Sequence, residues 1–208
     1  MGPSVSFRHL LVPCCRPLWP THPPAFPLNE LSEFSKPLLF AIGAHTAIGQ
    51  RRKYTAEPYS GHLEEVSSLV STVEGVTPDM VAAAWLHDTV EDTDVPLSLI
   101  ETEFGVSIAR LVHELTAVSG PNDGDRATRK ALDRAHTAAA STAAHTIKAA
   151  DLISNLRTVE ARDPAFAKIY MAEKALLLEV LVRADAGLCC TVRSILQNYH
   201  ERHAAHRI

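Results

Sequence analysis

The chain has 208 residues, enough for one sizeable domain or at most two small ones. Its composition, 46% hydrophobic and 21% charged, is that of a globular protein, and a net charge of −4 argues against an electrostatic nucleic-acid binder. No apolar run reaches the roughly 18–20 residues that span a bilayer, so we expect a soluble protein with no nucleic-acid and no membrane partner.

Residues 1–28 differ in composition from the rest of the chain. They contain seven of the thirteen prolines and no acidic residue. Proline at this density prevents a regular helix, and the segment lacks the apolar run and the cleavage site of a secretory signal. We expect a disordered extension here, although a transit peptide would also be acid-poor and contain arginine.

From residue 29 to about residue 200 the apolar residues recur at helical spacing, and no stretch shows the period-2 pattern of a strand. We therefore expect a single all-α domain over 29–200, followed by a flexible tail over 201–208. The expected helices lie within 29–49, 62–73, 78–92, 96–105, 107–119, 126–140, 142–158 and 165–198.

The four cysteines form two adjacent pairs, Cys14-Cys15 and Cys189-Cys190, with no C-x-x-C spacing. This arrangement favours neither a zinc knuckle nor a disulfide scaffold. We expect reduced cysteines in a cytoplasmic protein.

The stretch AAAWLHDTVEDTD (82–94) ends an apolar helix in a cluster of charged side chains. On a helix over 78–92, His87 and Glu91 share one face, and so do Asp88 and Asp92. The carboxylates repel one another, and a divalent cation would offset that repulsion. The alternative is an ordinary solvated helix end, and the His-Asp dipeptide alone does not decide between them.

Two other segments favour the metal. His62 stands at the start of the next helix upstream, and Asp151 lies in the apolar stretch IKAADLI, where a buried carboxylate is costly without a partner. With His87 and Asp88 they make two imidazoles and two carboxylates. Such mixed ligands suit Mn²⁺ or a similar divalent ion better than a structural zinc site built from cysteines.

Three motifs occur in the order that is typical of one family. RKYTAEPYSGHL, LHDTVEDT and IKAADLISNLRT resemble R-K-x-x-G-x-P-Y-x-x-H-P, H-D-x-x-E-D and K-x-A-D-x-x-x-N-x-R-T of the RelA/SpoT-type HD-domain hydrolases, in their stand-alone form, the small alarmone hydrolases. The resemblance covers about residues 41–160. Two departures are Leu63, where the family has proline, and Ala56, where it has the glycine of a turn; alanine enters positive φ less freely.

The resemblance implies an HD-domain helical bundle that binds a nucleotide, and from the length of the chain we expect a hydrolase without a synthetase domain. It implies Mn²⁺, or another divalent metal, as cofactor and hydrolysis of the 3′-pyrophosphate of guanosine tetra- or pentaphosphate, which releases pyrophosphate and GDP or GTP. The residues it assigns are metal ligands His62, His87, Asp88 and Asp151; catalytic acids Glu91 and Asp92; and substrate contacts Arg52, Lys53, Asn155 and Thr158.

Two other functions stay open at this point. One is an HD-type nucleotidase or phosphatase acting on another nucleotide, and the other is a metal- or nucleotide-binding module without turnover. The presence of both Glu91 and Asp92 disfavours the second, because a binding module would not need both. We interpret His45 as a packed or surface residue, although it could approach the site, and the histidines at 200, 203 and 206 as part of a solvated tail.

Overall fold

A computed structural model describes residues 31–53 and 55–204. In these residues the regular secondary structure is helical, and a single antiparallel bridge joins Arg51 to Pro58. The prediction of an all-α protein is confirmed, whereas the extension predicted for 1–28 lies outside the described residues. No helix in the described part of the chain is long and apolar enough to cross a membrane. The helices are α1 (Leu31–Ala47), α2 (Ser60–Ser71), α3 (Pro78–Leu86), α4 (Thr89–Asp92), α5 (Leu97–Phe104), α6 (Val106–Leu115), α7 (Arg126–Ala139), α8 (Thr142–Arg162), α9 (Pro164–Val180) and α10 (Ala186–Ala204).

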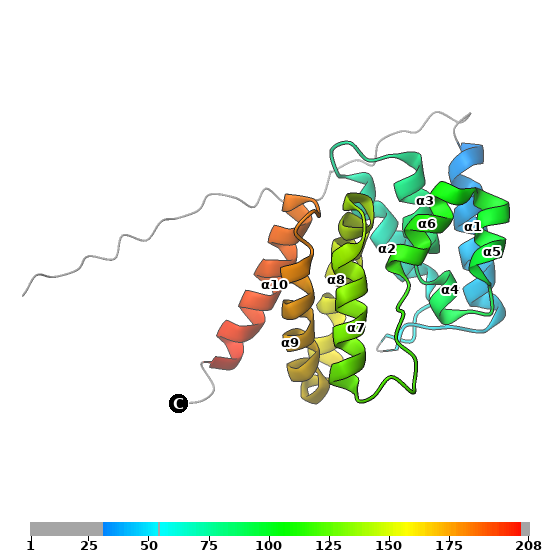
Figure 1. Ribbon diagram of the computed structural model, residues 1–208. Helices are drawn as coiled ribbons and strands as arrows, with labels where there is room; N and C mark the ends of the chain where they lie inside the picture. The colour runs from blue at the N-terminus through cyan, green and yellow to red at the C-terminus, as the bar shows by residue number, and fades with distance from the viewer. Residues whose placement is uncertain (1–30, 54, 205–208) are drawn as a thin grey trace, which may run out of the picture.

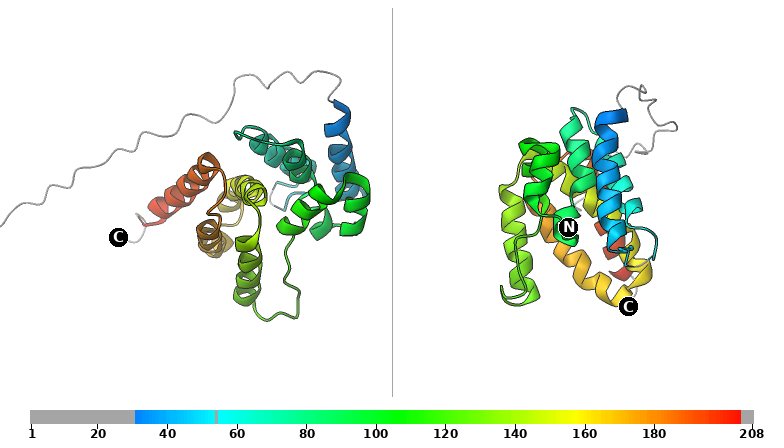
Figure 2. Two further views of the ribbon diagram at one scale, coloured as in Figure 1. Left: turned by 45° about the horizontal axis from the view of Figure 1, so that its top comes forward. Right: turned by 90° about the vertical axis from the view of Figure 1, so that its right-hand side faces the viewer.

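Helix α8 is the centre of the bundle. It contacts α2, α3 and α6 on one side and α9 and α10 on the other (Figures 1 and 2). Its buried residues include Ala149, Ala150, Leu152 and Ile153, each fully enclosed, and a helix that is apolar on several faces must be buried on several faces. A polar residue in the middle of α8 therefore faces the core.

Helix starts follow side-chain caps that the sequence contains. Thr77, Asp125 and Ser141 accept hydrogen bonds from the backbone N–H groups three residues on, at 3.3, 2.8 and 3.3 Å. Each cap satisfies a donor that the first helical turn leaves free, which stabilises a helix by about 1 kcal/mol. The predicted starts of α3, α7 and α8 agree with these caps.

The predicted helix over 78–92 is wrong in one respect that matters for the site. Helix α3 ends at Leu86, and α4 begins at Thr89. The carbonyl of Ala84, which the N–H of Asp88 would use in a continuous helix, accepts a hydrogen bond from Nδ1 of His87 at 2.8 Å. This side-chain bond competes with helix continuation, so His87 and Asp88 lie at a break.

The segment between α1 and α2 contains the turn for which the family pattern has glycine. Ala56 occupies it with φ of 58°, the left-handed region that glycine enters without a steric penalty. The turn is closed by backbone bonds from Arg52 N to Glu57 O (2.9 Å) and from Ala56 N to Arg52 O (3.0 Å). Ala56 therefore stands at a positive-φ position, which alanine enters less freely than the glycine of the family pattern.

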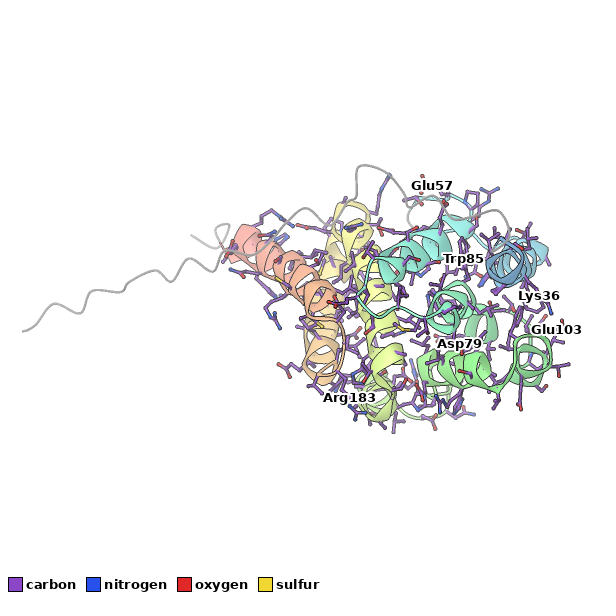
Figure 3. The ribbon with its side chains drawn as sticks, turned by 90° about the horizontal axis from the view of Figure 1, so that it is seen from above. Lys36, Glu57, Asp79, Trp85, Glu103 and Arg183 are labelled. Carbon is purple, nitrogen blue, oxygen red and sulfur yellow. The ribbon has the colours of Figure 1, made fainter. Side chains whose placement is uncertain are left out.

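The single helix predicted over 165–198 is two helices. The chain turns between Val180 and Ala186, where the N–H of Arg183 (labelled in Figure 3) donates to Nδ1 of buried His145 at 3.3 Å. Helix α10 also continues to Ala204, so the first half of the predicted flexible tail, 201–204, is helical.

Candidate metal centre and active site

The four predicted metal ligands converge in space from separate elements. His62 lies in the first turn of α2, His87 and Asp88 lie at the break after α3, and Asp151 lies in the middle of α8. The Nε2 atoms of His62 and His87 are 3.3 Å apart. An oxygen of Asp151 is 3.4 Å from Nε2 of His62, and an oxygen of Asp88 is 3.0 Å from Nε2 of His87.

Neighbouring groups fix the ring orientation of both histidines. Nδ1 of His87 donates to the Ala84 carbonyl, and Nδ1 of His62 lies 2.9 Å from Oγ of Ser154. The Ser154 hydroxyl donates to a carboxylate oxygen of Glu65 at 2.6 Å, so its oxygen accepts from His62. Both Nδ1 atoms therefore carry a proton, and both Nε2 atoms face the cluster, where they can bind a metal once Nε2 is deprotonated.

The two carboxylates of the cluster are also held by neighbours. The Tyr59 hydroxyl donates to Asp88 Oδ2 at 2.5 Å. Asp151 forms an ion pair with Lys148 Nζ at 3.1 Å and accepts from the Asn155 amide at 2.5 Å. Burial alone would raise the pKa of Asp151, but Lys148 and the two imidazoles outweigh it and hold that pKa well below its usual range.

The protonation of His62 responds to the same charges. Burial by itself would lower the pKa of His62, but hydrogen bonds to Asp151 and Asp88 raise it to about 9. The metal-free protein thus holds a proton where a cation would sit. Ligand atoms of His62, His87 and Asp151 all lie within 4.8 Å of one another, so a single divalent ion fits among them, with Asp88 adjacent.

A pocket of about 230 Å³ opens beside this cluster, and its lining contains both acidic and basic side chains. The acidic residues of the lining are Asp88, Glu91, Asp92, Asp133, Asp151 and Glu173; the basic ones are Lys130, Arg134, Lys148 and Lys174.

Glu91 and Asp92 both line the pocket, as the prediction of catalytic acids requires. Glu91 accepts a hydrogen bond from the backbone N–H of Ala117 at 2.9 Å, and burial raises its pKa above the usual range. Asp92 accepts from the side-chain amide of Gln50 at 2.7 Å.

The predicted substrate contacts occupy different positions. Asn155 lines the pocket, and Thr158 lies one turn further along α8. Arg52 donates to Oγ of Ser154 at 3.0 Å, which places its guanidinium behind His62. The ammonium of Lys53 lies 5.2 Å from the centre of the Phe166 ring.

Several side chains at the site were not assigned from the sequence. Tyr59 could have been found in the P-Y of its motif, and Lys148 precedes Asp151 by three residues, which places both on one helix face. Lys130, for which a substrate contact and a solvated face were equally open from the sequence, and Lys174 both line the pocket, from α7 and α9, which pack against each other.

The sequence profile of the HD domain matches residues 38–177. The chain belongs to the HD-domain family. Relatives of this HD-domain protein include the guanosine-3′,5′-bis(diphosphate) 3′-pyrophosphohydrolases MESH1 of Drosophila melanogaster (35% identity over 64% of this chain and 73% of that one) and Homo sapiens (37% identity over 65% and 74%). A solved structure is described as a metazoan ortholog of SpoT that hydrolyses ppGpp. Its superposition on this chain includes 84% of this chain and 98% of the other, with a TM-score of 0.73 and 28% sequence identity. The predicted resemblance to stand-alone alarmone hydrolases is confirmed.

Proposed function

We propose that this HD-domain protein is a metal-dependent phosphohydrolase that removes the 3′-pyrophosphate of guanosine tetra- or pentaphosphate. The products are pyrophosphate and GDP or GTP. The observation that carries the proposal is the convergence of two imidazole nitrogens and a carboxylate oxygen beside a pocket that contains Glu91 and Asp92. The activity for which the MESH1 relatives are named supplies the substrate.

His62, His87, Asp88 and Asp151 would hold the divalent cation, for which we propose Mn²⁺ because the donors are mixed nitrogen and oxygen atoms. Such a cation lowers the pKa of water and offsets negative charge on a phosphoryl group. The orientation of the donors comes from the chain itself, through the bonds of Ser154 and Ala84 to the two imidazoles.

Glu91 and Asp92 are proposed to orient the attacking water and to accept its proton. A raised pKa suits Glu91 for proton transfer near neutral pH. Water attacks the phosphorus attached to the ribose 3′ oxygen, the bond between that phosphorus and that oxygen breaks, and the pyrophosphate leaves with the oxygen of the water. The ribose 3′ oxygen takes up a proton, so no covalent enzyme intermediate is needed.

The basic residues of the pocket lining suit a substrate with several phosphates. Lys148 is paired with Asp151 and Lys130 with Asp133 (3.0 Å), whereas Lys174 forms no ion pair with another described residue. Its ammonium lies 4.9 Å from the centre of the Tyr170 ring, and burial and the charge of Lys148 lower its pKa to about 8. We assign Lys174 to an anionic group of the nucleotide, together with Asn155, and Arg52, Lys53 and Thr158 to the outer contacts that the family motif implies.

The test is incubation of the full chain with ppGpp and Mn²⁺, with the products resolved by anion exchange. GDP with pyrophosphate supports the proposal, and orthophosphate released from simple nucleotides would replace it with a nucleotidase. If the protein binds metal but hydrolyses no nucleotide, and Glu91→Gln behaves in the same way, the protein is a binding module and not an enzyme. We further propose that the catalytic domain spans residues 29–200, since α10 packs on α8 and α9, and that the protein is cytoplasmic.

A further inference from the structure

The end of α1 approaches the active site through a pair of side chains that the family motifs above do not include. Gly49 adopts φ of 64°, and this left-handed residue reverses the chain after α1. The N–H of Gln50 then donates to the carbonyl of His45 at 2.9 Å. The reversal brings the side chain of Gln50 back against the ring of His45.

Three polar groups form one chain from α1 to the pocket. His45 is only 1% exposed, and its Nδ1 lies 2.5 Å from Oε1 of Gln50. The Gln50 amide nitrogen donates to Oδ2 of Asp92 at 2.7 Å. Because a carboxylate only accepts, the amide nitrogen must face Asp92 and the amide oxygen must face His45. His45 therefore carries its proton on Nδ1, and each donor in the chain points toward Asp92.

The same ring supports a second carboxylate. His45 stacks on Tyr59, with ring centres 4.8 Å apart and an angle of 29° between the planes. The Tyr59 hydroxyl donates to Asp88. One buried imidazole thus lies behind both a candidate metal ligand and a candidate catalytic acid, with one intervening residue in each direction.

We propose that His45 and Gln50 are positioning residues that hold the Asp92 carboxylate in its working orientation toward water and substrate. The amide of Gln50 restrains rotation of Asp92, and His45 restrains the amide, which otherwise could flip and present its oxygen to the carboxylate. The inference rests on the proposed function for the role of Asp92, but the hydrogen-bond chain itself can be tested without turnover.

Matched variants separate hydrogen bonding from packing. Gln50→Leu keeps the size of the side chain and removes both bonds, so kcat should fall about 10- to 100-fold while KM and Mn²⁺ affinity change less than about twofold. His45→Leu should act in the same direction. His45→Asn keeps an N–H donor near the position of Nδ1 and should recover most of kcat, whereas His45→Gln places its amide at the position of Nε2 and should not. Lys36→Ala, an exposed change on the same helix, is the control for activity (Figure 3).

A ¹⁵N spectrum of histidine-labelled protein provides the readout that does not depend on activity. We expect the His45 ring to be protonated at Nδ1 in the parent protein, with that proton exchanging faster in Gln50→Leu. Protonation at Nε2, or a kcat of Gln50→Leu equal to that of the parent, would overturn the proposal. If the parent protein does not hydrolyse ppGpp but the Nδ1 tautomer is present and depends on Gln50, the substrate assignment fails while the hydrogen-bond chain stands.

Discussion

Ser154→Ala is the most informative single change, because one hydroxyl connects a candidate metal ligand to its supports. Oγ accepts from Nδ1 of His62 at 2.9 Å and from Arg52 at 3.0 Å, and it donates to Glu65 at 2.6 Å. Ser154 and His62 are 0% and 1% exposed, so water cannot easily replace the lost oxygen. The variant leaves the Nδ1–H of His62 without its acceptor.

The size of the effect follows from that unpaired donor. A buried group that loses its hydrogen-bond partner costs about 1–3 kcal/mol, and loss of a metal ligand's outer partner lowers metal affinity or activity about 10- to 100-fold. At about 1.4 kcal/mol per tenfold change, the two estimates describe the same loss. Titration calorimetry with Mn²⁺ should therefore give a dissociation constant raised about 10- to 100-fold.

Thr146→Val is the matched control, because it removes another buried hydroxyl from the same helix. That hydroxyl donates to Thr142 O at 3.0 Å and accepts from the N–H of Asp185 at 3.1 Å, away from the metal cluster. We expect Thr146→Val to lower thermal stability while Mn²⁺ affinity stays at the parent value. Equal Mn²⁺ affinity in Ser154→Ala and the parent would refute the role assigned to Ser154.

Three further predictions concern protons, substrate and the turn before α2. His62 is protonated in the metal-free protein below its pKa of about 9, so Mn²⁺ binding should release close to one proton. The affinity of the protein for Mn²⁺ should therefore rise about tenfold per pH unit from about pH 6.5 to 8. Calorimetry in buffers of different ionisation enthalpy measures the proton release, and its absence would contradict the prediction. Lys174→Met should raise KM for ppGpp about tenfold with Mn²⁺ affinity unchanged, whereas an unchanged KM would remove Lys174 from the substrate site. Ala56→Gly should stabilise the fold by about 0.5–1 kcal/mol in thermal unfolding, because glycine adopts φ of 58° without strain, while Gly105→Ala, at φ of 88°, should destabilise it; the opposite order would exclude strain at Ala56.

The helical fold was predictable because its signals are local. The apolar spacing is readable from neighbouring residues, and the caps Thr77, Asp125 and Ser141 stand directly before the predicted starts of three helices. The break between α3 and α4 was not readable in this way. It coincides with a bond from the His87 ring to the Ala84 carbonyl, and a helical pattern contains no sign of which side chain takes that carbonyl.

The candidate ligands were predictable for a different reason. Asp151 is a carboxylate in an apolar stretch, where burial without a partner is unfavourable, and His87 and Asp88 stand where an apolar run changes to charged residues. These local features identified them as candidates. Their supports carry no comparable mark. Ser154 is an ordinary small polar residue in sequence, and Lys174 comes to the pocket only through the packing of α9. The catalytic roles of Glu91 and Asp92 stay predictions until turnover is measured.

The candidate metal ligands come from distant parts of the chain, and this has a consequence for the lifetime of the protein. The candidate ligands come from α2, from the break after α3 and from α8, so a bound ion would act as a removable cross-link between distant segments of the core. An ion that binds only the folded state adds about 2.7 kcal/mol of stability at a hundredfold excess over its dissociation constant. Metal supply in the cell would then set how often the bundle opens, and resistance to proteolysis would follow metal availability before any substrate is encountered.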